Sequence, residues 1–213
     1  MECMEVVATI AAVAAAIAAA VTARFAYKQI KATNSQSLFA GRMSCWTRAK
    51  SLLSLFEENR TQIAVGEEPV LAVDLYATFL TNNAWLCDMA SAYSDPLQRP
   101  HHEILRTRIE EIRHTSMEAE ILFTEGAARS LSAFLKAYAD LLDVLYKYAI
   151  VVKQMRRLTE EQHWDLAKCC ESTNELTHRR ELAGAVDATT EAFNDFQRFG
   201  DKAIISQIRV IAK

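Results

Sequence analysis

The sequence predicts an all-α protein, and three observations lead to that class. The 213 residues include only five Gly and three Pro, so long loops and tight hairpins are scarce. Hydrophobic residues make up 51% and charged residues 24% of the chain, which is enough to bury a core without metals or disulfides. Apolar residues also recur at helical spacing along most of the chain. We therefore expect helices that pack as one bundle.

The first element is an apolar segment from Val6 to Ala23. It has 18 residues without a charge, and ten of them are Ala. As a helix it would rise about 27 Å, close to the ~30 Å hydrocarbon thickness of a bilayer. We therefore predict a transmembrane anchor over residues 1–23, with the lipid bilayer as a partner. A cleaved signal peptide ending at Val21-Thr22-Ala23 and a soluble alanine-rich helix in an oligomer core are the alternatives.

Charges on the two sides of this segment predict its orientation. Arg24, Lys28 and Lys31 follow it, whereas Glu2 and Glu5 precede it. Basic flanks stay on the cytoplasmic side of a membrane. We therefore expect a single-pass protein of the cell inner membrane whose C-terminal domain lies in the cytoplasm.

The alanines of the same segment repeat at intervals of four residues. Small side chains at this spacing form a flat face, which lets two helices approach closely in lipid. We therefore expect the chain to assemble with itself as a homo-oligomer through one such ladder, made by Ala8, Ala12, Ala16 and Ala20.

The rest of the chain predicts a cytoplasmic helical bundle over residues 24–200 and a C-terminal amphipathic helix over 201–213. Helical periodicity continues from the anchor through about Phe56, and the run Gly66-Glu67-Glu68-Pro69 indicates a helix end followed by a helix start. Further helices are expected, in order, over about 69–92, 100–123, 127–156 and 160–199.

The last of these helices is predicted from a capping-box pattern. Thr159 and Gln162 have the spacing of a capping box, which would place a helix start at about Glu160. Gly184 is a candidate kink in that helix, and Gly200-Asp201 would separate it from the C-terminal helix.

The charge distribution argues against a nucleic-acid-binding protein. Residues 24–60 carry seven Lys or Arg against two Glu, whereas residues 61–98 carry five acids and no base. Neighbouring segments of opposite sign more readily face each other than form the coherent basic surface that nucleic acid requires.

Cysteine and histidine spacing predicts neither a metal site nor a cofactor. The five cysteines are odd in number and show no C-x-x-C spacing, so we expect reduced thiols. Two Glu-x-x-His pairs facing inward could bind a di-iron centre in a four-helix bundle. The three pairs lie in polar stretches and fit exposed helix faces better: Glu111 with His114, Glu160 with His163, and Glu175 with His178.

Arg157 and His163 are the candidate catalytic pair. In HEPN-type ribonucleases, an Arg and a His at a short helical interval bind the scissile phosphate and serve acid/base catalysis. Here Leu158 takes the place of the usual polar residue after the Arg. The spacing is also one residue longer than the commonest form of that motif.

The layout of the whole chain resembles one known family. An N-terminal membrane helix, a basic juxtamembrane helix and a helical domain with a degenerate Arg157…His163 pair are similar to the membrane-anchored, HEPN-like accessory protein of RNA-targeting type VI CRISPR systems. The resemblance implies an oligomeric pore that acts in antiviral defence. It also implies RNA or a defence-system protein as a further partner.

We therefore expect a non-enzymatic membrane protein that assembles into a homo-oligomer and acts in antiviral defence, either by forming a pore or by otherwise perturbing the membrane. The sequence contains no Gly-rich phosphate loop, no G-x-S-x-G elbow and no H-E-x-x-H motif. A membrane-tethered HEPN-like ribonuclease that uses Arg157 and His163 is the enzymatic alternative. An anchored helical scaffold that recruits a partner is the third hypothesis.

Overall fold

The computed structural model describes residues 2–61, 65–66, 68–70 and 87–211, and the side chains of 17–61, 65–66, 68–70, 87–124 and 126–208. Within this part of the chain every regular element is a helix, which confirms the all-α class. The elements are α1 (Glu2–Asn59), α4 (Ala90–Ser94), α5 (Arg99–Leu122), α6 (Glu125–Gln162), α7 (Leu166–Thr173), α8 (Glu175–Phe199) and α9 (Asp201–Ile211).

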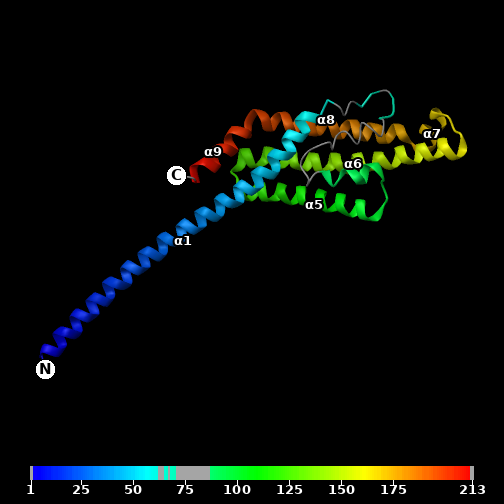
Figure 1. The fold of residues 1–213 in the computed structure, drawn as a ribbon. Helices are drawn as coiled ribbons and strands as arrows, with labels where there is room; N and C mark the ends of the chain where they lie inside the picture. Colours follow the sequence, from blue (N-terminus) through cyan, green and yellow to red (C-terminus); the bar gives the residue numbers. More distant parts are fainter. Residues whose placement is uncertain (1, 62–64, 67, 71–86, 212–213) are drawn as a thin grey trace.

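The long helix α6 is the centre of the bundle, and it packs along α5 on one side and α8 on the other (Figure 1). The second half of α1 and the short α9 cover one end, whereas α7 lies at the opposite end. The buried residues of α6 recur at three- and four-residue intervals, as a helix with two packed faces requires. They include Leu131, Phe134, Leu135, Tyr138, Leu142 and Leu145.

An aromatic cluster joins three helices in the core. Phe56 of α1 lies with its ring centroid 5.5 Å from that of Phe193 in α8 and 5.9 Å from that of Phe134 in α6. Tyr138 of α6 packs edge-on to Phe56 at 6.1 Å. These separations are those of favourable aromatic pairs, so the cluster fixes the second half of α1 against the bundle.

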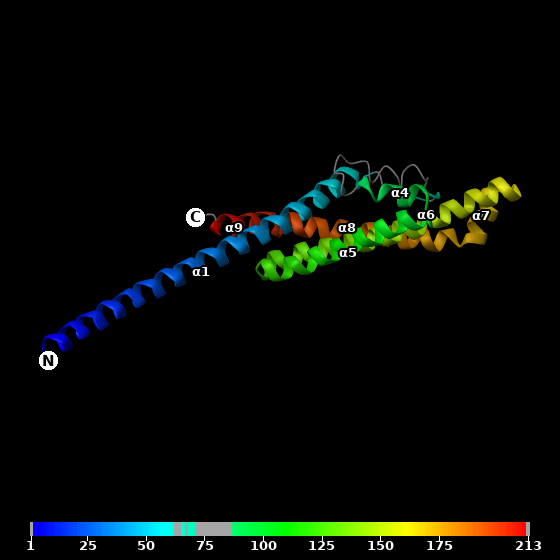
Figure 2. The ribbon, with the colours of Figure 1, turned by 60° about the horizontal axis from the view of Figure 1, so that its bottom comes forward.

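Helix α1 continues beyond the bundle without a break. Every described side chain from Ile17 to Leu38 is exposed, and Phe39 is the first that is partly buried. Figures 1 and 2 both show the N-terminal half of α1 standing away from all other helices. We refer to residues 17–38 as the projecting segment. At about 1.5 Å per residue it is roughly 33 Å long.

Arg42 fastens α1 at the point where it enters the bundle. Its Nε donates to the carbonyl oxygen of Leu122 (2.6 Å) and a terminal nitrogen donates to that of Gln207 (3.0 Å). The guanidinium also lies 5.8 Å from the centre of the Phe123 ring. One side chain therefore joins α1 to the end of α5 and to α9.

The predicted transmembrane anchor over 1–23, and with it the inner-membrane localisation, is corrected. In the described part of the chain, no helix is both long and apolar enough to cross a membrane. Ten of the 18 uncharged residues from Val6 to Ala23 are Ala, and only six are Val or Ile, whose insertion into a bilayer is favourable by about 0.3–0.6 kcal/mol each.

The prediction of one helix over 160–199 was also wrong. α6 runs on to Gln162 and ends at His163, whose φ of 55° is left-handed. Thr159 does not cap a new helix, because its hydroxyl donates to the Met155 carbonyl (3.1 Å) inside α6. Asp165 instead caps α7 by accepting from the backbone N–H of Lys168 (2.8 Å). α8 then runs through Gly184 as a single helix.

The other predicted helix boundaries agree with the structure in part. The helix predicted over 100–123 is α5 to within one residue at each end, and α9 begins at Asp201, next to the predicted break. The helix predicted over 127–156 is longer at both ends, because Gly126 lies in the first turn of α6. The helix predicted over 69–92 lies mostly outside the described residues.

Candidate functional site

The predicted catalytic pair lies at the end of α6. Arg157 Nε is 3.6 Å from Glu161 Oε2, and both side chains are exposed. His163 is the C-cap residue, its backbone N–H donates to the Thr159 carbonyl (3.1 Å), and its side chain is exposed. In the described part of the chain, no hydrogen bond or ion pair joins Arg157 to His163. Their role in RNA cleavage stays a prediction.

Arg157 also lines a pocket of about 320 Å³ between α6 and the α4 region, and His163 does not. Two further cations, Lys153 and Arg156, line the same pocket. Lys153 is paired with Asp95, and Arg156 Nε donates to Glu160 Oε1 (2.7 Å). Because each cation has a carboxylate partner, this pocket does not offer an unbalanced positive charge to a phosphate.

The three Glu-x-x-His pairs do not converge. Glu111 accepts from Arg108 (2.8 Å), and His114 lies 3.4 Å from Glu118. His178 lies 3.3 Å from Glu181. Over the residues that the structure describes, no group of three His, Cys, Asp or Glu side chains is placed to hold a metal ion. The pairs form separate surface or local contacts.

Glu175 is a buried carboxylate that sequence reasoning placed on an exposed face. Its side chain has no exposed surface, accepts a hydrogen bond from the Tyr148 hydroxyl (2.5 Å) and lies 3.3 Å from a terminal nitrogen of Arg179. The Tyr148 hydroxyl in turn accepts from the backbone N–H of Val70 (3.0 Å). Burial, and then the bond to Glu175, raise the pKa of Tyr148. The network joins α8 to α6 through the buried carboxylate.

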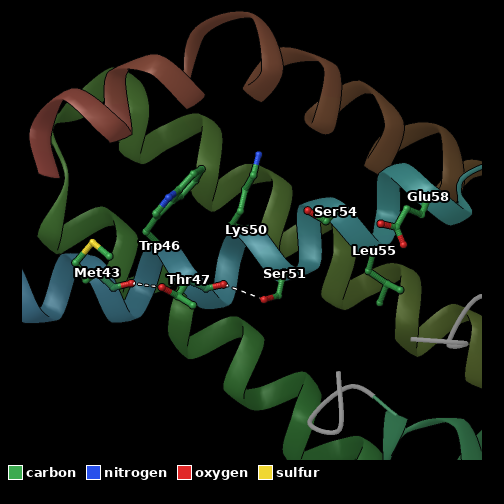
Figure 3. A pocket seen from close by; sticks show the side chains of 8 residues that line it. All are labelled: Met43, Trp46, Thr47, Lys50, Ser51, Ser54, Leu55 and Glu58. Carbon is green, nitrogen blue, oxygen red and sulfur yellow. Dashed lines mark hydrogen bonds between the residues drawn. The ribbon is translucent and has the colours of Figure 1, made fainter. Parts of the chain in front are cut away.

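A shallow groove of about 500 Å³ follows one face of α1 (Figure 3). Two of its three hydroxyls are engaged within the helix, because Thr47 donates to the Met43 carbonyl (2.8 Å) and Ser51 to the Thr47 carbonyl (3.0 Å). Lys50 lies 3.7 Å from Asp201 and 5.7 Å from the Trp46 ring centre. The other polar side chains of the lining, Ser54 and Glu58, lie one turn apart on the same helix, whereas a binding site usually brings several polar groups together.

A second groove, of about 660 Å³, lies between α6 and α8, and we call it the α6–α8 groove. Small side chains and charged side chains both line it. The lining residues are Gly126, Arg129, Ser130 and Ala133 from α6, and Ala188, Glu191, Ala192, Asp195 and Phe199 from α8. Phe199, at one end, is 72% exposed. Small residues at helical spacing let another helix approach closely.

The projecting segment exposes several large apolar side chains to solvent. Ile17, Val21 and Phe25 are 61%, 49% and 67% exposed, and they follow one another at four-residue intervals. Intervals of four place side chains on adjacent positions of one helix face. Of the predicted oligomerisation residues, Ala20 is exposed beside them, whereas the side chains of Ala8, Ala12 and Ala16 lie outside the described ones.

These features define the protein as a helical bundle with a projecting helix, in which the described pockets hold no recognisable catalytic set. No protein-family model, curated protein or solved structure matches the chain. The exposed apolar side chains of α1 are the feature of the molecule that most directly indicates a function.

Proposed function

We propose that this protein is a non-catalytic, self-assembling helical protein, in which the projecting segment of one copy binds a second copy. The observation that carries the proposal is the exposure of Ile17, Val21 and Phe25 on adjacent positions of one helix face. Contiguous large apolar side chains in water are unfavourable, and such patches mark sites of interaction. Covering them would remove apolar area from water at about 25 cal/mol per Å².

The length of the projecting segment supports the same proposal. Residues 17–38 receive no tertiary contact that buries a side chain. In water, helical stability comes mostly from packing of an apolar face, and isolated helices are marginal. A second copy that packs on the segment would supply the missing stabilisation. An alanine-rich helix in an oligomer core was one of the alternatives raised by the sequence.

The partner proposed is the chain itself, because assembly explains the apolar face without a catalytic site. In the pocket at the end of α6 the cations Lys153 and Arg156 are paired with carboxylates, and in the groove along α1 the Thr47 and Ser51 hydroxyls donate within the helix. Substrate chemistry needs groups that are free to act on a substrate.

The test is the mass of the full-length protein in solution, measured by light scattering over a range of concentrations. We expect a mass of at least twice 23.9 kDa. Val21→Asp combined with Phe25→Asp should weaken association by at least about 100-fold, because two carboxylates would be buried without partners.

A matched control uses the other side of the same helix. Ala19→Asp combined with Ala26→Asp adds the same charge to exposed positions of the projecting segment, but away from the Val21 and Phe25 face. This variant should keep the wild-type mass. A wild-type protein that remains at 23.9 kDa at every concentration would refute the proposal. Equal weakening by the two double variants would remove the assignment to that face.

A further inference from the structure

We infer that the projecting segment of one copy lies in the α6–α8 groove of a second copy. The inference rests on the proposed self-assembly and names the surface that receives the helix. Its first basis is shape: small residues such as Ala188 and Ala192 line the groove, whereas the segment presents the large side chains of Val21 and Phe25. Large side chains of one helix pack between small ones of its neighbour.

The second basis is charge. The segment contains Arg24, Lys28 and Lys31 and no acidic residue. Glu191 and Asp195 line the α8 side of the groove, and Arg129 is the one cation among the described residues of the lining. Opposite charges across an interface guide the partners together and fix their register.

The groove cation Arg129 comes from the first turns of α6, near Ser130. A Cβ at Gly200 would lie 2.9 Å from the Ser130 hydroxyl oxygen, so this part of α6 is close to the Phe199 end.

The receiving groove belongs to another copy because α1 is one continuous helix that leads away from its own bundle (Figure 2). α1 leaves the bundle beside the C-terminal end of α5 and beside α9, where Arg42 donates to the carbonyl oxygens of Leu122 and Gln207. Gly126 and Phe199 lie at that same end. Two copies that exchange their projecting segments would therefore bury both grooves and close as a dimer of about twice 23.9 kDa.

The experiment is a charge-swap series on the full-length protein, with the dissociation constant measured by light scattering or native mass spectrometry. Glu191→Lys with Asp195→Lys, or Arg24→Glu with Lys28→Glu, should each weaken association by about tenfold or more. All four changes together should restore association to within about threefold of wild type. As a control, Glu171→Lys with Asp187→Lys changes two exposed acids that do not line the groove and should leave association unchanged.

The outcomes separate this inference from the proposed function. Weakening by both pairs, with restoration in the fourfold variant, supports the inference even if one pair lowers stability, because a folding defect would not be repaired by a distant charge. Weakening by the helix pair alone would overturn it and would indicate that the projecting segments bind each other. A monomeric wild-type protein would refute both.

Discussion

Tyr148 donates a hydrogen bond of 2.5 Å to the buried carboxylate of Glu175, and this bond joins the middle of α6 to the first turn of α8. Both residues have no exposed surface. The same hydroxyl accepts from the backbone of Val70, so one oxygen atom serves three segments of the chain. A buried charge is tolerated only where it is paired and hydrogen-bonded.

Tyr148→Phe should therefore lower the free energy of unfolding by about 1–3 kcal/mol, because it leaves a buried carboxylate oxygen and a backbone N–H with fewer partners. Urea unfolding followed by circular dichroism measures the change. Tyr27→Phe, at a position that is 69% exposed, is the control and should change stability by less than about 0.5 kcal/mol. Equal midpoints for the two variants would show that the network is energetically neutral.

Gly200→Ala should destabilise the protein by about 1–3 kcal/mol. A Cβ at this position would lie 2.3 Å from two carbons of the Phe196 ring, and that ring is fully buried and has no room to move. Gly184→Ala is the matched control, since it lies within α8 with no atom within 4 Å of its Cβ position. It should stabilise by about 0.5–1 kcal/mol. Opposite shifts in melting temperature are expected, and shifts of the same sign would contradict this packing.

Arg42→Lys should lower the free energy of unfolding by about 1–2 kcal/mol. The guanidinium reaches the carbonyl oxygens of Leu122 and Gln207 together, and a single ammonium group lacks that planar geometry. The comparison is Arg48→Lys, because Arg48 is half-exposed and lies 3.9 Å from Glu118. Surface pairs of that kind contribute little, so its effect should stay below about 0.5 kcal/mol. Chemical denaturation of both variants decides whether Arg42 fastens α1.

Cys45 should make stability fall as the pH rises. Burial raises the pKa of its thiol from 9.0 to about 11, and the side chain is fully enclosed. The unfolded thiol loses its proton near pH 9, whereas the folded one keeps it up to about pH 11, so alkali favours unfolding in this interval. Between pH 9 and pH 11, the free energy of unfolding of the wild type should therefore fall by up to about 2 kcal/mol relative to that of Cys45→Ala. A difference that stays constant with pH would contradict the raised pKa.

The sequence predicted those features that depend on local spacing. The ends of α5 follow from Pro100 near the start and from a helical pattern that ends at Phe123, and the break near Gly200 follows from its glycine. The end of α6 was missed because the left-handed residue there is His163 and not Gly or Asn. A search for glycine does not find such a helix end.

The candidate site was less accessible to sequence reasoning. Apolar residues such as Phe25 and Ile30 recur at helical spacing although they are exposed, and buried residues recur at the same spacing. The periodicity therefore does not reveal that α1 leaves the bundle. The burial of Glu175 depends on Tyr148, which is distant in sequence. The α6–α8 groove likewise arises only when two separate helices lie side by side.

The projecting segment also governs how the molecule diffuses. A rod of roughly 33 Å that projects from a bundle raises the frictional drag on the molecule by a larger fraction than it raises the mass. A single copy would therefore elute early from a gel-filtration column and could be mistaken for a larger species. A copy whose rod lies along a neighbour would be more nearly spherical for its mass. The ratio of elution volume to scattered-light mass thus reports whether the rod is docked.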